Sequence, residues 1–247
     1  MDKLLYVAMS GAKETMRAQA ANSHNLANSS TTGFKADLSA FQSRAVTGPG
    51  YASRVYATDQ TVGFDRGQGA IEQTGNPLDI ALHGNGYFAV QDVTGNEAYT
   101  RAGDLHVDPN GQLLTATGLP VLGDNGPISI PPHSSVAIGG DGTVSIVPLG
   151  QTPNTLSNVG RIKLVNPSFD SIQRGADGLY RATNGQPLEA DANTTIDSGS
   201  LESSNVNLAS CMVNMIELSR RYDLQIKALH TEEEDAQSSS KLLQSSG

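Results

Sequence analysis

The sequence predicts a mainly β central domain, built of hairpins and meanders, between long N- and C-terminal α-helices that pair as a coiled coil. Residues at both ends recur with helical spacing, whereas Asn-Gly and Asp-Gly turn dipeptides punctuate the middle. Aromatic residues make up only 5% of the 247 residues, and tryptophan is absent. This composition favours turn-rich β structure over the large core of an α/β enzyme.

Residues 1–35 are predicted to form the N-terminal helix and the turn that follows it. Mostly small side chains recur there at spacings of three and four residues, as expected for one helix face. The stripe consists of Leu4, Ala8, Gly11, Thr15, Ala18, Asn22 and Asn25. Residues 28–32 are poor in helix formers and Gly33 can take a positive φ, so the helix should end there. We expect the turn to be fixed by Asn25, Leu26, Asn28, Gly33 and Phe34.

The middle of the chain is predicted to be β structure. Residues 36–70 lack a helical stripe and are interpreted as an extended connector with a strand at 51–58, and residues 71–200 as a β-rich domain. Turn dipeptides occur at Asn85-Gly86, Asn110-Gly111, Asn125-Gly126, Asp141-Gly142, Asp177-Gly178 and Asn184-Gly185. The short runs between them cover residues 87–93, 113–115, 136–138, 144–147 and 161–165.

Residues 201–247 are predicted to form the C-terminal helix, with Ser204 or Asn205 as its cap. Its buried face is expected to contain Leu208, Met212, Met215, Ile216, Tyr222, Ile226 and Leu229. A helix of nearly 40 residues is about 55 Å long, more than a compact domain of this size can cover. Two interpretations remain open: the terminal helices pair and leave apolar surface for neighbouring chains, or they form a self-contained hairpin packed on the β domain.

No catalytic, cofactor-binding or metal-binding site is predicted, and we expect the protein not to be an enzyme. The sequence contains no Walker loop, GxSxG elbow or HExxH pair, and the five histidines stand in separate contexts. Gly84 to Ala89 has the outline of GxGxxA, but a β-rich run follows it where a phosphate site needs a helix. The turns at Asp108 and Asp141 resemble calcium loops only in part, and turn chemistry explains them.

The net charge, the aromatic content and the N-terminal residues indicate which kinds of binding partner and membrane attachment to expect. The net charge of −9 and the lack of a basic stripe disfavour nucleic acid, and the aromatic-poor middle gives little reason to expect a small-molecule substrate. Cys211 is the only cysteine, which excludes an intramolecular disulfide. The apolar run from Leu4 to Met9 is too short for a signal peptide or a membrane span, so we expect neither a cleaved leader nor membrane insertion.

Three groups of residues resemble the flagellar rod and hook protein family. The N-terminal motif is Asn25-Leu26-Ala27-Asn28 followed by Thr31-Thr32-Gly33-Phe34-Lys35, and the C-terminal motif includes Gly199 to Asn207 and Arg220-Arg221-Tyr222. The middle adds Gly75 to Ala81 and Tyr99 to Gly103. The opening residues and the length are most similar to proximal rod members, with distal rod or hook-type members as the alternative. His24 and Cys211 depart from the family's usual residues without interrupting the apolar stripes.

The resemblance implies a structural axial subunit that assembles helically in the proximal rod, transmits torque and encloses the export channel. Residues 1–35 and 201–247 would form the inner tube, and residues 71–200 would lie outside it. The implied partners are copies of the chain, other rod proteins and the flagellar export apparatus. The implied place is the basal-body rod across the periplasm, reached without a cleaved signal peptide. The terminal segments would be disordered before assembly.

Two other classes of function remain as alternatives. The chain could be a secreted β-rich hydrolase with a helical dimerisation stalk, because carboxylate pairs meet in space and not in sequence order. It could also be a soluble ligand-binding module, which would need a concave apolar pocket.

Overall fold

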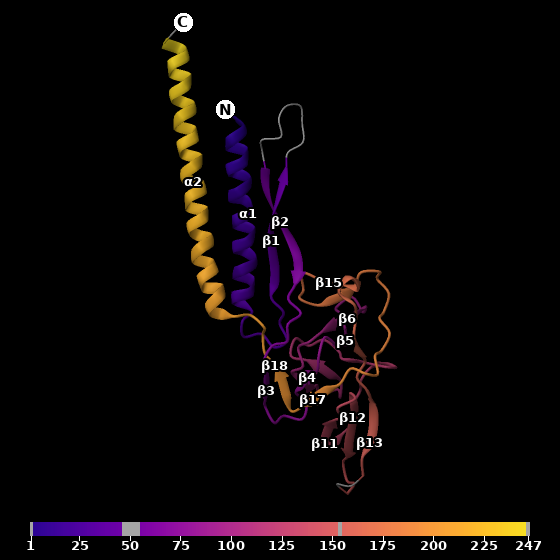
Figure 1. The fold of residues 1–247 in the computed structure, drawn as a ribbon. Coiled ribbons are helices and arrows are strands. Elements are labelled where there is room, and N and C mark those ends of the chain that lie inside the picture. Colours follow the sequence, from indigo (N-terminus) through magenta and orange to yellow (C-terminus); the bar gives the residue numbers. More distant parts are fainter. Residues whose placement is uncertain (1, 46–54, 153–154, 246–247) are drawn as a thin grey trace. The chain divides into compact units, whose positions relative to one another are not determined.

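A computed structural model describes residues 2–45, 55–152 and 155–245 (Figure 1). The chain divides into two compact units and crosses between them four times. Unit 1 contains Met1–Ser29, Ala36–Asp65 and Val206–Gly247, and unit 2 contains Ser30–Lys35 and Arg66–Asn205. Each unit is described separately below.

Unit 1 consists of two long helices and a two-stranded ribbon. Helix α1 spans Asp2–Ala27 and α2 spans Leu208–Ser245. Strands β1 (Asp37–Ala45) and β2 (Val55–Phe64) pair antiparallel, with an irregularity in register between Leu38 and Ser39. Helix α1 contacts α2 on one side and the β1–β2 ribbon on the other (Figure 1). The predicted connector at 36–70 therefore contains this ribbon, and part of the strand expected at 51–58 falls outside the described residues.

The prediction that the terminal helices pair as a coiled coil is wrong. A coiled coil needs large apolar side chains at two positions of each heptad on both helices. The buried side chains of α1 are instead small or polar, among them Ala18, Thr15 and Asn22, and a Cβ on Gly11 would lie 3.1 Å from the side-chain amide nitrogen of Gln225. Helix α1 also contacts the ribbon, so the fold around it is a layered one and not a two-helix supercoil.

Helix α2 begins at Leu208, and its cap lies two or three residues after the predicted cap residues Ser204 and Asn205. The side-chain oxygen of Asn207 accepts a hydrogen bond from the backbone amide of Ser210 at 3.0 Å, which is the geometry of an N-cap. Asn205 instead donates from its backbone to the carbonyl of Phe34 and from its side chain to the carbonyl of Gly67. Neither described helix contains an apolar stretch long enough to cross a lipid bilayer.

Unit 2 is mainly β, which agrees in part with the prediction for the middle of the chain. Its largest sheet has five antiparallel strands in the order β14-β5-β6-β16-β15, and a second has three in the order β11-β12-β13. The strands of these sheets are β5 (Tyr87–Gln91), β6 (Glu97–Thr100), β11 (His133–Ile138), β12 (Thr143–Pro148), β13 (Ser157–Arg161), β14 (Leu164–Val165), β15 (Ile172–Arg174) and β16 (Tyr180–Ala182). A single 3-10 turn, η1 (Phe169–Ser171), precedes β15.

Four short antiparallel ladders complete unit 2. They pair β17 with β4, β18 with β3, β7 with β8 and β10 with β9. Their strands are β3 (Ile71–Gln73), β4 (Ile80–Leu82), β7 (Leu105–Val107), β8 (Leu113–Thr115), β9 (Leu122–Gly123), β10 (Gly126–Pro127), β17 (Ile196–Ser198) and β18 (Ser200–Glu202). The turn at Gly84 to Gly86 leads into strand β5, as predicted, and not into a helix.

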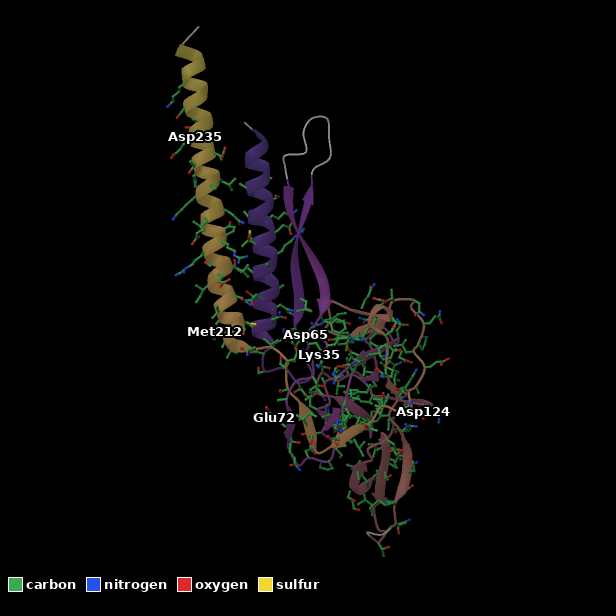
Figure 2. The ribbon with its side chains drawn as sticks, viewed as in Figure 1. Lys35, Asp65, Glu72, Asp124, Met212 and Asp235 are labelled. Carbon is green, nitrogen blue, oxygen red and sulfur yellow. The ribbon has the colours of Figure 1, made fainter. Side chains whose placement is uncertain are left out.

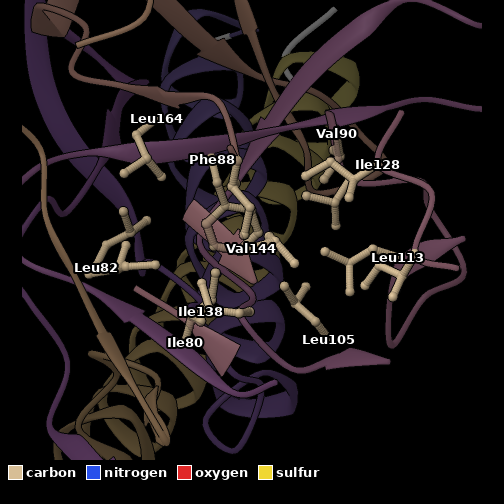
Figure 3. Close-up of a cluster of buried hydrophobic side chains, with 14 of the residues drawn as sticks. Ile80, Leu82, Phe88, Val90, Leu105, Leu113, Ile128, Ile138, Val144 and Leu164 are labelled. Atoms are coloured by element: carbon tan, nitrogen blue, oxygen red, sulfur yellow. The ribbon is translucent and has the colours of Figure 1, made fainter. Parts of the chain in front are cut away.

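One apolar core joins these sheets. Aliphatic side chains and Phe88 from at least six strands meet there, and several have no exposed surface (Figure 3). Members labelled in the figure include Ile80, Leu82, Phe88, Val90, Leu113, Val144 and Leu164. Burial of this many aliphatic groups makes unit 2 a domain with a core of its own.

Candidate assembly interface

Asparagine side chains hold the three chain segments at one end of unit 1 together. Asn22 of α1 donates to the backbone carbonyl of Cys211 at the start of α2, at 2.8 Å. Asn25 pairs with the backbone of Asp37 at the start of β1: its nitrogen donates to the carbonyl at 2.9 Å and its oxygen accepts from the amide at 2.8 Å. Both asparagine side chains are buried, so these amides satisfy backbone groups that the close packing removes from water.

Asn28 ends helix α1. Its backbone amide and its side-chain amide both donate to the carbonyl of His24, at 3.2 Å and 2.9 Å. The imidazole of His24 lies 2.7 Å from the carboxylate of Asp37. The Asn-Leu-Ala-Asn motif therefore ends the helix and joins it to β1, while Leu26 is half-buried.

Helix α2 carries an exposed apolar band in its first turns. Leu208, Met212 and Ile216 follow at intervals of four residues, so they lie one above the other, and they are 47%, 51% and 58% exposed in the single chain. Figure 2 places Met212 at this end of α2 and Asp235 towards the other end. Val213 and Leu224 widen the band. Of these five residues, Leu208, Met212 and Ile216 belong to the face predicted to be buried, and within the single chain about half of their surface stays exposed.

The face of α2 that packs on α1 is rotated away from that band. Cys211 and Leu218 are its buried members, and the predicted residues Met215, Tyr222, Ile226 and Leu229 are half-buried. On α1, Ala8 and Gly11 are half-buried, and the side chain of Leu4 lies outside the described residues. Met9 and Met16 are exposed on the other face of α1, seven residues apart. The sequence analysis missed both, although their spacing marks a common face.

A groove of about 350 Å³ opens within unit 1 beside the two asparagines. Asn22 and Asn25 line it from α1, Leu218 and Arg221 line it from α2, and Asp37 lines it from β1. It combines aliphatic, amide and charged groups, which is the composition of a protein-contact surface more than of a small-molecule pocket.

The Gly-Phe-Lys part of the N-terminal motif belongs to unit 2. Gly33 has φ +66°, and a Cβ there would overlap the carbonyl of Arg101, so glycine is required on two grounds. Its amide donates to the carbonyl of Glu202 at 2.7 Å. The buried ring of Phe34 lies 4.3 Å below the guanidinium of Arg174, which also donates to the carbonyl of Lys35.

Lys35, Arg101 and Glu202 form a buried charge cluster that we call the clasp. Their side chains are at most 1% exposed. The Lys35 ammonium lies 2.6 Å from one Glu202 oxygen, and Arg101 donates twice to the other, at 2.8 Å and 2.6 Å. Lys35 also donates to the carbonyl of Gly67, and Arg101 also donates to the carbonyl of Gly86. Pairing of opposite charges together with such hydrogen bonds is what allows charges to be buried.

Several titratable groups elsewhere in unit 2 have structural partners. Burial raises the pKa of Tyr87, whose ring lies 5.6 Å from the Arg101 guanidinium. The turn carboxylates of Asp108 and Asp141 accept bonds from amides and a hydroxyl in their own turns, and both have lowered pKa values for that reason. Among the described residues, no three His, Cys, Asp or Glu side chains gather as a metal-ligand set.

Comparison with known proteins agrees with this architecture. Three family models match: "Flagella basal body rod protein" over residues 5–35, "Flagellar hook protein FlgE/F/G D1 domain" over 81–146 and "Flagellar basal body rod FlgEFG protein C-terminal" over 197–242. The flagellar basal-body rod protein FlgF of Escherichia coli (strain K12) is 41% identical over 249 residues, covering 98% of this chain and 99% of the relative. The chain belongs to the flagellar basal-body rod protein family. It is a structural component of the flagellar basal body and not an enzyme.

Other rod proteins are similar over most of their length. FlgF of Salmonella typhimurium is also 41% identical, with 98% of this chain and 99% of the relative covered. FlgG of Buchnera aphidicola subsp. Schizaphis graminum is 34% identical, with 89% and 92% covered. The higher identity and coverage of these two FlgF proteins agree with the expected similarity to proximal rod members.

Proposed function

We propose that the protein is a subunit of the proximal rod that joins copies of itself and other rod proteins through unit 1, with unit 2 outside the helical tube. The observation that carries the proposal is the exposed apolar band of α2, made by Leu208, Met212 and Ile216. Exposed apolar side chains gathered on one helix face mark an interaction site. In a rod, a neighbouring subunit would cover this band.

The two surfaces of unit 1 support stacking in one direction. The apolar band lies on α2, whereas the exposed methionines Met9 and Met16 lie on α1, so the surfaces differ in position and composition. Contacts between two different patches are heterologous and generate open helical arrays instead of closed dimers. Such an array is the arrangement needed to transmit torque and to enclose a channel.

We further propose that the helices of unit 1 order on assembly. The contact between α1 and α2 consists largely of small and polar groups, and the residues of the apolar band keep about half of their surface exposed in the isolated chain. Neighbouring subunits would supply the missing apolar burial, and part of the binding free energy would then be used in ordering the helices. The proposed interface is the full predicted set on α1, on α2 and in the turn after α1.

The proposed route to the rod is the flagellar export apparatus, and the proposed place is the part of the rod that crosses the periplasm. An unfolded or partly ordered unit 1 is compatible with passage through a narrow channel, because its long helices would otherwise have to travel as rigid rods of about 40 to 55 Å.

The apolar band can be tested with one charge at two positions of the same helix. Ile216→Asp places a carboxylate in the band, and Ser210→Asp places one in the first turn, where a negative charge is favourable. We expect Ile216→Asp to abolish swarming and recovery in isolated rods, and Ser210→Asp to retain both. Circular dichroism of the two purified chains should show the same unit 2 unfolding transition. Normal rod recovery of Ile216→Asp would refute the band as an assembly contact.

A further inference from the structure

We propose that the clasp of Lys35, Arg101 and Glu202 is already folded in the free monomer and holds the chain segments that lead into unit 1 close together. It thereby raises the effective concentration of α1 for α2, an effect that we call priming. The inference rests on the proposed function, since it explains how helices that order on assembly find each other. All three residues of the clasp belong to unit 2.

The residues of the clasp lie close in sequence to the points where the chain passes from one unit to the other. The chain passes between the units after residues 29, 35, 65 and 205. Lys35 is the last residue before one crossing, and Gly67, whose carbonyl accepts from Lys35 at 2.7 Å, follows another by two residues. Glu202 precedes the last crossing by three. One cluster therefore contacts every stretch of unit 2 that leads into unit 1.

Backbone bonds join the same stretches directly. Gly33 donates to the carbonyl of Glu202 at 2.7 Å, and Asn205 donates to the carbonyl of Phe34 at 3.2 Å. The amide of Gly69 donates to a carboxylate oxygen of Glu202 at 2.9 Å, and Ser203 donates to the carbonyl of Ala70 at 2.8 Å. The segments 30–35, 66–70 and 202–205 are thus hydrogen-bonded to one another, with the Glu202 carboxylate at their centre.

Burial strengthens this junction. Glu202 has no exposed surface and accepts four hydrogen bonds, two from Arg101, one from Lys35 and one from the amide of Gly69. Loss of either cation would leave the buried carboxylate with fewer partners, which is costly. We therefore expect the junction to belong to the stable part of unit 2 and not to its fraying ends.

The consequence for unit 1 follows from loop closure. Asn22 and Cys211, which meet where α1 contacts α2, are 189 positions apart. With Gly33 fixed to Glu202, only about twenty residues separate them along the shortest connected path. Without that bond, the β3–β18 ladder of the folded unit 2 still joins Ile71 to Glu202. The path is then about 58 residues, 49 from Asn22 to Ile71 and 9 from Glu202 to Cys211. Since closure probability falls as the three-halves power of loop length, the clasp raises the effective concentration of one helix for the other by roughly 5-fold.

Hydrogen exchange on the full-length monomer tests the clasp. We expect the amides of Gly69, Ser203 and Asn205 to be protected in the wild type, even if α1 and α2 exchange freely. Lys35→Met keeps the Arg101–Glu202 pair and so keeps unit 2 folded, and it should speed exchange at these amides by about 10-fold while strand β5 is unchanged. Lys163→Met is the matched control, because it removes a lysine that lies 2.7 Å from Glu97 in the same unit. Equal exchange in the two variants, or unprotected amides in the wild type, would overturn the proposal.

Disulfide formation tests the priming. Asn22→Cys opposite Cys211 reports, through its equilibrium with glutathione, the effective concentration of one helix for the other. The Lys35→Met background should lower this value, by up to the roughly 5-fold predicted from loop length, and the Lys163→Met background should leave it unchanged. Equal values would refute priming. Rod recovery of Ile216→Asp is an independent readout, so failure of the assembly proposal and failure of the clasp proposal are distinguishable.

Discussion

The side-chain amide of Asn22 donates to the backbone carbonyl of Cys211 across 2.8 Å, and this bond holds the end of α1 against the start of α2. The two residues are 189 positions apart, so the bond depends on the fold and not on local sequence. Asn22 is 8% exposed, so removal of its amide would leave a largely buried carbonyl without this donor.

Asn22→Asp is expected to impair rod assembly. The substitution keeps the size of the side chain but replaces the donor with a carboxylate oxygen that faces the Cys211 carbonyl, and the loss of a buried bond costs about 1–3 kcal/mol. Swarming in soft agar and rod recovery should both fall. Ser23→Asp adds the same charge at the next position, on the exposed face of α1, and should behave as the wild type. Equal behaviour of the two variants would show that the bond is dispensable.

Gly33→Ala is expected to destabilise unit 2 more than an ordinary glycine substitution. The residue has φ +66°, which costs a non-glycine residue about 1–2 kcal/mol, and the added Cβ would also overlap the carbonyl of Arg101. Gly185→Ala is the matched control, because Gly185 has φ +68° with nothing within 4 Å of a Cβ. Urea unfolding should show a clearly larger loss for Gly33→Ala. Equal losses would mean that the segment shifts to make room.

Asp104→Asn is expected to stabilise unit 2 at neutral pH. Burial, with a smaller effect of the Asp79 charge, raises the pKa of Asp104 above its ordinary value of 3.8, and its Oδ1 is buried without a hydrogen-bond donor. A raised pKa means that ionisation costs stability as pH rises through the folded value, and the cost is absent below the unfolded value. The gain should therefore be present at pH 7 and vanish near pH 3.

Asp108→Asn is expected to destabilise unit 2 at neutral pH, the opposite of the effect expected for Asp104→Asn. The backbone amide of Gln112 donates to the Asp108 carboxylate at 2.7 Å and lowers its pKa, so the charged form is the favoured one in the folded state. This stabilisation is present above the unfolded pKa and is lost as pH falls through the folded one. Thermal unfolding from pH 3 to pH 7 should show Asp104→Asn gaining and Asp108→Asn losing stability relative to the wild type as pH rises. The same trend for both would contradict the assignment of the two environments.

The β-rich middle and the helical ends could be predicted because their signals are local. Leu113 to Thr115 is strand β8 as expected, and the Asp-Gly turns at 141 and 177 lie between paired strands. Gly33 has the positive φ that its place after the helix suggested. The coiled-coil prediction was wrong because apolar residues spaced alternately by four and three along α2 can be assigned to either of two neighbouring helix faces. A shift of one residue, from Met212 to Cys211, rotates the buried face by about 100°.

The clasp could not be predicted, because its members have no periodic relation. Lys35 and Glu202 are 167 positions apart, and Arg101 and Glu202 are 101 apart. A charged residue in sequence also predicts a solvated side chain, and only the fold shows that all three are buried. The motifs around Lys35 and Glu202 identified two segments that contain members of the clasp, but nothing in these motifs indicated that the two segments are in contact.

Cys211 should report the ordering of unit 1. Burial raises the pKa of its thiol, and the side chain is 8% exposed where α1 packs on α2, so reaction with a disulfide reagent requires the helices to separate. If the helices order only on assembly, the free monomer should react with Ellman's reagent at pH 8 nearly as fast as the chain in urea, and isolated rods should react at least about 10-fold more slowly. Asn22→Asp monomers should match wild-type monomers, since there would be no pairing to lose. A wild-type monomer as slow as the rod would mean that α1 and α2 already pair in the free chain, and ordering coupled to assembly would have to be abandoned.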